Sequence, residues 1–495
     1  MVNNIKPVLI VGGGTAGWLA ALLTKQQYPD LKVVVVASEE RGIIGAGEGT
    51  VPHFIHVLER LNISPKDIIV SCKGTIKLGI NFVNWNGDGE SFWHGFDAAP
   101  SSGVVVHKIP KEELAYVALN KGTLDGVNLN KRLVDEGKVP FVFGSPSNVH
   151  PFSNYALHFD AVLLAKFFKK IALERGIQYI DDEVVNVSVE GENQVAYVAL
   201  KNSPAIHPEF VFDCSGLARV ILGKALKAKW QSYASTLFCD RAIPFFVPHD
   251  NRVQPCTHAI AMNFGWVWKI PVQGRYGCGY VFDSKRISDV EAVKEIYDAF
   301  GINVEAPRAF SFSAGCYETP LKGNCLAVGL AHSFLEPMEA TSIWGTCVML
   351  IKFLTQGGLH SRTELFQRRY NKGALEMADA YRMFISLHYA TRRKDTQFWE
   401  ALATITDTDI LDRLHALECD ITHDPWCPEF TYVSWATFFA ALKHFSVGKL
   451  TQQTNCYDTS SLARNVGQKI NRISELSGKC MSHNDFLNIV MRTPV

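Results

Sequence analysis

Residues 12–17, near the start of the chain, have the types and spacing needed to bind a dinucleotide. Their sequence, Gly-Gly-Gly-Thr-Ala-Gly, contains the pattern Gly-x-Gly-x-x-Gly. The first glycine of that pattern permits a tight turn, the second lets the backbone approach a pyrophosphate, and the third lets helix and strand pack closely. N–H groups at the helix start then bind the phosphates. We therefore predict cofactor contacts from Gly12, Gly14, Thr15, Ala16 and Gly17.

The acidic residue that usually holds the ribose hydroxyl, about 20 residues beyond such a motif, is missing. The second apolar run ends at Ala37, and the next polar side chains are Ser38 and Glu39. Two interpretations stay open. Either Glu39 reaches the ribose from the loop, or Ser38 takes its place.

Two later apolar runs suit strands that return to the same cofactor. They are residues 210–213 and 326–331, and small or acidic residues end or follow them. A second glycine-rich strand–helix–strand unit is absent from the sequence, so we expect one dinucleotide and not two. A later strand returns to the cofactor in FAD proteins of this type, so the two runs favour FAD over NAD and a discontinuous domain. The cofactor-binding candidates in these runs are Asp213, Gly216, Gly329 and Leu330.

Lys77 lies in a stretch, 75–85, where apolar side chains alternate with small or polar ones. Period-two alternation predicts one strand, with Lys77 pointing away from the apolar face. Such a lysine could project into a channel. It could equally lie on a solvated strand face, where most lysines are found.

Three further ionisable side chains allow a catalytic and a structural interpretation. Glu336 and Glu339 flank Pro337, and proline disfavours a helical residue before it, so the two carboxylates need not face the same way. Either could be a solvated or capping residue. His94 follows two aromatic residues and is an active-site imidazole or a hydrogen-bonded core histidine.

The surrounding pattern predicts the elements that position these residues. Strands are expected at 7–11 and 31–37, and a helix between them at 18–25. Residues 364–393 carry an apolar stripe at spacings of three and four, typical of a core-facing helix, and 435–445 look helical too. Trp266 and Trp268 share one strand face, which on its own is typical of a bulky core.

Composition limits the function classes. Lys+Arg and Asp+Glu are 49 each among 495 residues, which argues against a broad nucleic-acid surface. Apolar runs fall far short of the roughly 20 residues that span a bilayer, and no signal peptide opens the chain. The 12 cysteines are scattered without metal-site spacing, so we expect reduced thiols, no metal and a cytoplasmic enzyme.

Five segments, in order along the chain, resemble the flavin-dependent halogenases of the tryptophan-halogenase family. Residues 266–271 match the pattern W-x-W-x-I-P, and 334–342 resemble E-P-L-E-S-T-G with its flanks. The other three are 45–52, 75–85 and 387–399. The resemblance implies an α/β fold: an FAD-binding Rossmann-like domain of the glutathione-reductase or monooxygenase type, with an inserted β-sheet region. It places the flavin-binding part at 1–350 and a mainly helical subdomain, covering the substrate site, at 351–495.

The resemblance also implies roles and a reaction. Reduced FAD and O2 give a flavin hydroperoxide, a halide attacks it, and the hypohalous acid travels to Lys77, which delivers halogen to an electron-rich arene. A separate flavin reductase supplies FADH2, and a homo-oligomer is compatible with the family. The residues implied are Lys77 and Glu339 (catalytic), Glu48 (flavin), Thr341 and Ser342 (halide), and His94, Trp266, Trp268 and Glu336 (substrate or flavin side).

The sequence departs from the family pattern at the halide segment, where Ala340 and Ser342 replace serine and glycine. We hypothesise that bromide and iodide are therefore preferred to chloride. The indole-clamping residues of tryptophan halogenases have no convincing counterpart from residue 440 onward. Free tryptophan is therefore one candidate substrate among several, beside a phenol, an indole, another small arene or a carrier-tethered group. A single-component flavin monooxygenase and a non-catalytic flavoprotein are the competing classes.

Overall fold

The chain forms two compact units, each assembled from three separate segments. A computed structural model describes residues 6–42, 45, 47–142, 151–191, 193–249, 253–304, 309–360, 362–404, 408–423 and 430–492. The first unit consists of Met1–Cys72, Phe159–Ser235 and Ser311–Tyr381, and the second of Lys73–His158, Thr236–Phe310 and Arg382–Val495. The first unit is thus discontinuous and interleaved along the chain with the second, and neither unit has the bounds of the predicted parts 1–350 and 351–495.

A mainly parallel sheet forms the centre of the first unit. Its order is β20-β21-β12-β1-β2-β9, in which β20 is antiparallel to β21 and the other neighbours are parallel. All four residues of β1 are buried, as is typical of a parallel strand covered on both faces. The bounds are β1 Val8–Val11, β2 Val33–Ala37, β9 Gln178–Asp181, β12 Phe210–Asp213, β20 Leu321–Lys322 and β21 Cys325–Ala327.

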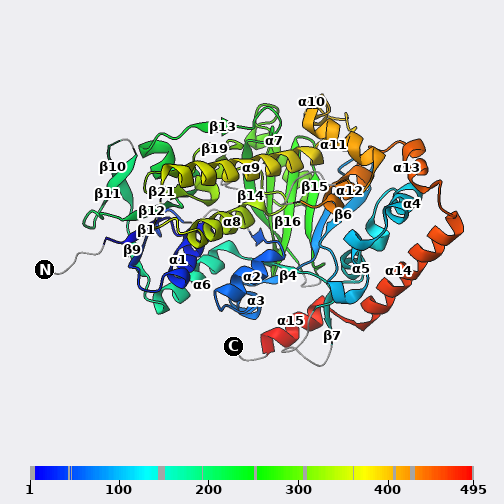
Figure 1. Cartoon of the computed structure of the whole chain (residues 1–495), viewed down its shortest axis with the longest axis horizontal. Helices are drawn as coiled ribbons and strands as arrows, with labels where there is room; N and C mark the ends of the chain where they lie inside the picture. The colour runs from blue at the N-terminus through cyan, green and yellow to red at the C-terminus, as the bar shows by residue number, and fades with distance from the viewer. Residues whose placement is uncertain are drawn as a thin grey trace. The chain divides into compact units, whose positions relative to one another are not determined.

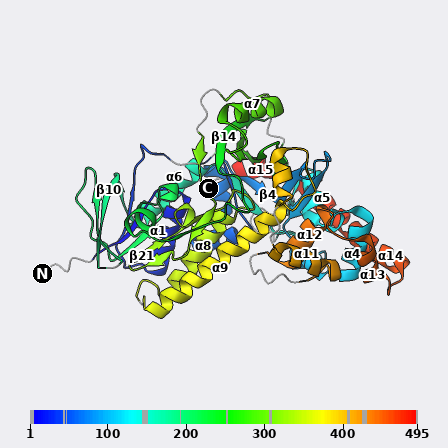
Figure 2. The ribbon, with the colours of Figure 1, turned by 90° about the horizontal axis from the view of Figure 1, so that it is seen from above.

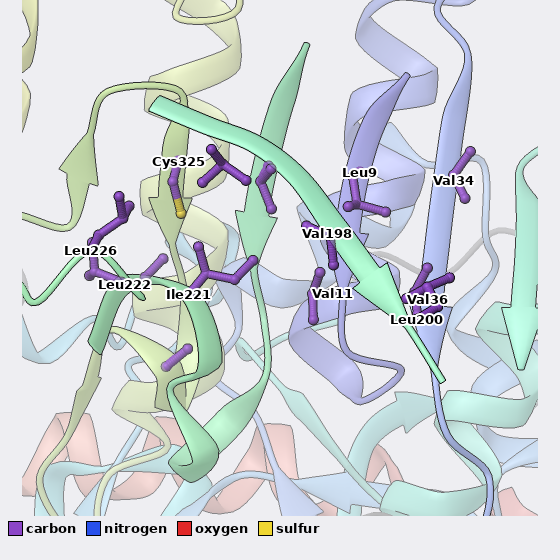
Figure 3. Packing of buried hydrophobic residues seen from close by; sticks show 14 of the residues in the cluster. Leu9, Val11, Val34, Val36, Val198, Leu200, Ile221, Leu222, Leu226 and Cys325 are labelled. Atoms are coloured by element: carbon purple, nitrogen blue, oxygen red, sulfur yellow. The ribbon is translucent and has the colours of Figure 1, made fainter. Parts of the chain in front are cut away.

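Helices cover this sheet, and α1 packs against both α6 and α8 (Figure 1). On the other face, side chains of β1, β2 and β12 meet the hairpin β10–β11 and the π-helical turn η5 in one apolar cluster (Figure 3). The expected strand–glycine turn–helix–strand unit is therefore confirmed. The bounds are α1 Thr15–Gln27, α2 His53–Arg60, α3 Pro65–Ser71, α6 Ala161–Glu174, α8 Thr341–Thr355, β10 Val184–Glu190, β11 Gln194–Leu200 and η5 Val220–Ala225.

Shorter elements complete the first unit. β13 (Trp230–Ser232), β19 (Gly315–Tyr317) and β22 (Ser333–Phe334) form a small antiparallel sheet. The remaining bounds are β3 Glu48–Gly49, η4 Gly216–Ala218 and η6 Gly329–Ala331.

A seven-stranded sheet forms the centre of the second unit. Its order is β18-β14-β17-β16-β15-β5-β6, and α7 lies over one face near β14 (Figure 2), burying Ala292 and Ile296 there. The bounds are β5 Gly79–Val83, β6 Ser91–Gly95, β14 Arg241–Pro248, β15 Thr257–Ala261, β16 Gly265–Val272, β17 Arg275–Phe282, β18 Phe310–Ser311 and α7 Asp289–Phe300.

The single strand expected at 75–85 is wrong. Residues 75–77 form β4, which pairs with β8 (Ala156–Phe159), whereas Gly79–Val83 belong to the seven-stranded sheet. All three residues of β4 are buried, so exposure does not distinguish its two faces, and the direction predicted for Lys77 stays a prediction. In β5, Ile80 and Phe82 of the predicted apolar face are buried, and on the predicted polar face Asn81 is half-buried whereas Gly79 is buried.

Helices dominate from residue 351 onward in the described part of the chain, as expected. The predicted stripe of α9 is buried at Ala374, Met377, Ala378, Tyr381, Phe384 and Ile385. None of the helices described here is long and apolar enough to cross a membrane. The bounds are η1 Pro100–Ser102, η2 Val106–Lys108, α4 Lys111–Lys121, η3 Asp125–Val127, α5 Leu129–Asp135, β7 Lys138–Val142, α9 Glu364–His388, α10 Gln397–Leu402, α11 Thr408–Cys419, α12 Tyr432–Ala441, α13 Val447–Thr454, α14 Thr459–Lys479, β23 Cys480–Ser482 and α15 His483–Arg492.

Candidate functional site

The glycine-rich turn between β1 and α1 has the geometry of a phosphate-binding loop. Gly12 has a φ of +123°, and a Cβ there would overlap the carbonyl of Cys214 at the end of β12. A Cβ on Gly17 would overlap the carbonyl of Gly12. Around Gly14, by contrast, a Cβ would meet nothing within 4 Å. Two glycines thus permit close packing, and the third leaves open space at the N-terminus of α1, where an anion binds favourably.

Thr15 connects this turn to the loop that carries Glu48. The Thr15 hydroxyl donates a hydrogen bond to the Glu48 carboxylate at 3.1 Å. Burial, together with the nearby Asp160 carboxylate, raises the pKa of Glu48 to about 7, against the opposing effect of the Thr15 hydrogen bond. Glu48 therefore retains a proton through much of the range in which a free glutamate is ionised. Ala46, in the same loop, lies outside the described residues.

We predict that Glu48 makes the stability of the flavin-free protein depend on pH. Between pH 4.5 and about 7 the unfolded chain releases this proton and the native chain keeps it, so the free energy of unfolding falls as pH rises. Glu48→Gln removes that titration. Thermal unfolding is measured from pH 5 to 8. The free energy of unfolding of Glu48→Gln, relative to that of the wild type, should rise up to about pH 7 and then stay constant. Parallel curves across the whole range would contradict the raised pKa.

The carboxylate of Asp213 holds its own turn. One oxygen accepts from the backbone N–H and the hydroxyl of Ser215, at 3.1 and 2.6 Å. The other accepts from the N–H groups of Ile221 and Leu222, at 3.0 and 2.8 Å. Because both oxygens are engaged, a cofactor contact at this strand end would come from the backbone or from Gly216.

The edge of the sheet beyond Ala37 carries a carboxylate that the sequence reasoning missed. Ala37 pairs with Asp181 of β9, whose carboxylate accepts from the N–H of Glu39 at 2.9 Å. The Glu39 carboxylate itself is largely exposed and pairs with Lys169 at 2.6 Å. Asp181 is therefore a third candidate beside Ser38 and Glu39 for the ribose. Only strand pairing reveals it, since it lies 142 residues from Glu39 along the chain.

The start of α8 adjoins the glycine-rich turn through Gly329. This glycine has a φ of +63°, and a Cβ there would lie 2.8 Å from the side chain of Ala16. Leu330 follows in η6. Just before α8, Glu339 and Ala340 adopt left-handed φ values of 61° and 56°. Left-handed conformations in non-glycine residues are costly and cluster at functional sites.

A cavity of about 20 Å³, room for about one water-sized group, opens beside the start of α8. Glu336 lines it, whereas Glu339 is not among its lining residues, so the two carboxylates are placed differently, as Pro337 suggested. Both are buried, with 2% and 7% of their surface exposed. The other lining residues that concern the site are Gly329, His332, Thr341 and Ser342.

His332 was missed by the sequence reasoning. It is 1% exposed, and within the described residues neither of its ring nitrogens has a hydrogen-bond partner. Burial, and to a smaller extent the Arg219 charge, lowers its pKa to about 3, so the imidazole is neutral near pH 7. A neutral imidazole offers one donor and one acceptor to whatever enters the cavity.

Lys77, in the second unit, is 2% exposed. Its Nζ lies 5.7 Å from the centre of the Phe96 ring, within cation–π range. Lysine is almost never fully buried without a partner or a function. The interpretation of Lys77 as a residue on a solvated strand face is therefore wrong.

A buried hydrogen-bonded frame surrounds the strand that carries Lys77. The Thr75 hydroxyl donates to the Pro271 carbonyl at 2.7 Å, so its oxygen accepts from Nδ1 of His158 at 3.1 Å. The Thr257 hydroxyl then donates to Nε2 of His158 at 2.9 Å. Burial, and next the charge of Lys77, hold the pKa of His158 well below its usual range. The frame formed by Thr75, His158 and Thr257 is thus uncharged.

Trp266 and Trp268 lie on one face of β16, as predicted, with ring centroids 6.5 Å apart. Trp266 is 1% exposed and packs edge-on against Trp85. Trp268 lies opposite Gly279 of β17, where a Cβ would overlap its ring, and within the described residues its indole N–H has no acceptor. Trp266 is therefore a core residue, and Trp268 carries an unused donor.

His94 lies in an aromatic cluster of the second unit. Its Nε2 is 3.0 Å from the Ser434 hydroxyl, and its ring contacts those of Phe384 and Phe438. Ser434 and Phe438 belong to α12. His94 is thus a hydrogen-bonded histidine within an aromatic cluster. Its role at a substrate site stays a prediction.

The comparisons with known proteins define the class. The chain matches the sequence family described as tryptophan halogenase over residues 7–446. It therefore belongs to the tryptophan halogenase family, and the resemblance found in the sequence is confirmed. The protein is a flavin-dependent halogenase and thus an oxidoreductase.

Individual relatives span nearly the same length. The chain is 31% identical over 427 residues to 7-chloro-L-tryptophan 6-halogenase KtzR of Kutzneria sp. (strain 744), covering 80% of this chain and 82% of that protein. It is 30% identical over 433 residues to tryptophan 7-halogenase RebH of Lentzea aerocolonigenes, covering 81% and 79%. The structure of tryptophan 6-halogenase SttH from Streptomyces toxytricini matches with a TM-score of 0.87 at 26% identity, over 98% of this chain and 100% of that one. The mixed α/β fold is thereby confirmed.

Proposed function

We propose that this enzyme oxidises a halide to hypohalous acid with reduced FAD and O2, and that Lys77 delivers the halogen to an electron-rich arene. The observation that carries the proposal is the burial of Lys77 in a frame of neutral hydrogen-bonding groups. An amine that receives an oxidant benefits from the exclusion of water, and the burial of Lys77 provides that exclusion. The proposed substrate class is an aromatic ring, free or carrier-tethered.

The first unit fits the dinucleotide. Open space at Gly14, the N-terminus of α1 and the approach of Gly329 to Ala16 leave backbone N–H groups available for phosphates at the carboxyl ends of the parallel strands. Bound reduced FAD would supply the electrons that activate O2 for halide oxidation. Thr15 and Glu48 would orient the adjoining loop through their hydrogen bond.

The start of α8 suits a halide. Its N-cap residue, Ala340, has no side-chain oxygen to cap the first-turn N–H groups. These N–H groups carry the positive end of the helix dipole, so they favour an anion beside Thr341 and Ser342. The adjacent cavity, of about 20 Å³, has room for about one ion.

Lys77 and Glu339 would carry out the later steps. The Lys77 ammonium can hold hypohalous acid by hydrogen bonding, or its amine can form an N–halogen bond with loss of water. Glu339, buried and held in a left-handed backbone conformation, would orient the oxidant or take the proton from the halogenated ring.

The test is product analysis by mass spectrometry. The protein is incubated with a flavin reductase, NADH, FAD, O2 and a panel containing tryptophan, indoles and phenols, with chloride, bromide and iodide in turn. We expect a halogenated arene that requires both the reductase and the halide. NADPH oxidation by the purified protein alone, or flavin binding without product for any halide and arene, would count against the proposal.

A change at the halide segment should alter halide preference. Ser342 lines the cavity, and we expect loss of its side chain in Ser342→Gly to enlarge the space next to the α8 N–H groups. We expect the wild type to use bromide faster than chloride and the variant to raise the chloride-to-bromide ratio of kcat/KM severalfold. Steady-state rates with each halide at fixed FADH2 measure this. Chloride turnover at least as fast as bromide in the wild type would end the hypothesis.

A further inference from the structure

Residues 477–483 are fixed against residues 136–142 within the second unit. β23 pairs antiparallel with β7, and the N–H of His483 donates to the Gly137 carbonyl at 2.8 Å. This contact holds the first residue of α15 in place.

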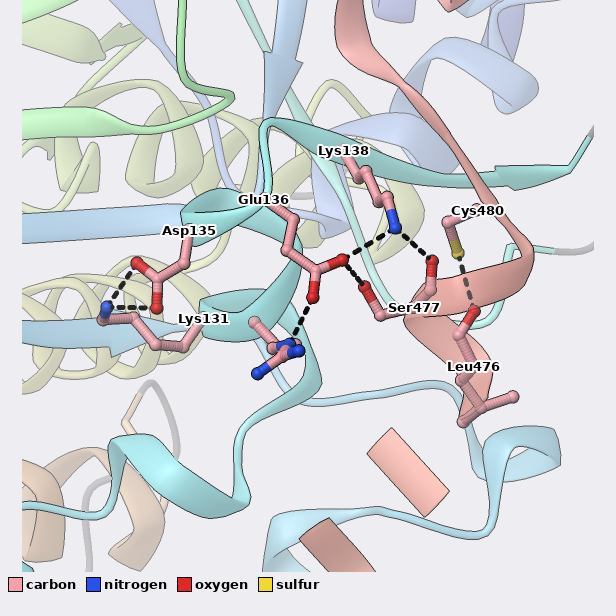
Figure 4. Close-up of polar contacts among 8 residues, drawn as sticks. Lys131, Asp135, Glu136, Lys138, Leu476, Ser477 and Cys480 are labelled. Carbon is pink, nitrogen blue, oxygen red and sulfur yellow. Dashed lines mark hydrogen bonds and ion pairs between the residues drawn. The ribbon is translucent and has the colours of Figure 1, made fainter. Parts of the chain in front are cut away.

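A polar network strengthens that attachment (Figure 4). The Lys138 ammonium donates to the Glu136 carboxylate at 2.7 Å and to the Ser477 carbonyl at 3.0 Å, and the Ser477 hydroxyl donates to Glu136 at 2.7 Å. Although burial opposes ionisation, hydrogen bonds from Lys138, Ser477 and Arg132 lower the pKa of Glu136 to about 2. The network therefore stays charged across the physiological range.

The imidazole of His483 joins two backbone groups that are distant in sequence. Its Nδ1 lies 3.1 Å from the Val253 carbonyl, and its Nε2 lies 3.3 Å from the backbone nitrogen of Ile76. A carbonyl only accepts and a backbone N–H only donates, so Nδ1 carries the proton and Nε2 accepts. Burial lowers the pKa of His483 to about 4, which keeps this neutral form dominant. The ring is 1% exposed.

Ile76 directly precedes Lys77 in β4. This strand lies at the edge of its three-stranded sheet and pairs with β8 on one side. On its other side, the Ile76 N–H donates a hydrogen bond to Nε2 of His483. A buried N–H without an acceptor is costly, so this bond fixes the backbone of β4 at the residue before the lysine.

We propose that His483 is a positioning residue for Lys77: by accepting the Ile76 N–H it sets the backbone from which the buried amine projects. The inference rests on the proposed role of Lys77 in halogen delivery. Residue 483 lies beyond the family match, which ends at residue 446.

A matched pair of amide variants tests the proposal. The oxygen of glutamine can occupy the place of Nε2, whereas asparagine reaches only the place of Nδ1. His483→Gln can therefore keep the Ile76 bond, and His483→Asn can keep only the Val253 bond. Backbone hydrogen exchange of peptides covering 75–83 is measured by mass spectrometry, and halogenation kinetics are measured on the same proteins.

We expect His483→Asn to exchange at Ile76 about tenfold faster than the wild type. We also expect it to lose roughly tenfold to a hundredfold in kcat, with the arene KM and FAD affinity unchanged. His483→Gln should have the wild-type exchange rate at Ile76 and the wild-type kcat. Equal behaviour of the two variants, or faster exchange spread through the whole second unit, would overturn the proposal. The exchange measurement needs no turnover. It therefore tests the hydrogen bond between Ile76 and His483 even if the proposed reaction is not observed.

Discussion

Lys77→Met should lower arene halogenation by roughly 10²- to 10³-fold, the range usual for loss of one preorganised hydrogen-bond donor at the reacting atoms. Methionine has a similar length and no charge, and Lys77 is buried, so the variant should fold as well as the wild type or better. FAD affinity should not change, because the glycine-rich turn belongs to the other unit. Product yield by mass spectrometry, flavin titration and thermal unfolding together measure these effects.

Lys131→Met is the matched control. Lys131 also belongs to the second unit, but its ammonium forms an ion pair with Asp135 near the surface (Figure 4), where a pair contributes little to stability. The control should halogenate at the wild-type rate. If Lys77→Met gave the same products in the same yield, free hypohalous acid would be the halogenating species and Lys77 would have no part in its delivery.

Two glycine substitutions should separate folding from cofactor binding. A Cβ at Gly17 overlaps the carbonyl of Gly12, so Gly17→Ala should lower the free energy of unfolding by about 1–3 kcal/mol or more. A Cβ at Gly14 meets nothing within 4 Å, and the φ of this residue, −82°, suits alanine. Gly14→Ala should therefore fold normally and bind FAD at least tenfold more weakly, because its methyl group fills the space proposed for the pyrophosphate.

Urea unfolding and fluorescence titration with FAD distinguish the two variants. The expected pattern is a lowered midpoint for Gly17→Ala, and a normal midpoint with weakened flavin binding for Gly14→Ala. Wild-type FAD affinity in Gly14→Ala would show that the cofactor does not approach this turn.

Local sequence patterns predicted the helices and strands, whereas the partners of the side chains depend on contacts between residues distant in sequence. Glycine spacing and apolar runs correctly predicted β1, α1 and β2, because each depends on neighbours within about 30 residues. The stripe on α9 was predictable for the same reason. The break at Leu78 was missed, because alternation cannot show that β4 and β5 pair in different sheets.

Several residues of the candidate site were beyond sequence reasoning. His483 meets Ile76 across 407 positions, and His158 meets Thr75 across 83, so no local signal connects either pair. The Asp213 carboxylate accepts N–H groups up to nine residues further on, contacts that no local pattern shows, and its predicted cofactor contact stays a prediction. The signal for His332 is the cavity it lines, which only the folded chain shows.

The interleaving of the two units affects how the protein is made. β12 is complete at Asp213, but its neighbour β21 begins only at Cys325, about 110 residues later. At typical synthesis rates of about 5–20 residues per second, the ribosome needs roughly 5–20 seconds to produce that partner. Throughout that interval one edge of a buried parallel strand has no native neighbour, a state prone to incorrect pairing. Correct assembly of the first unit in the cell therefore depends on how long the nascent chain is protected, as well as on the final stability of the sheet.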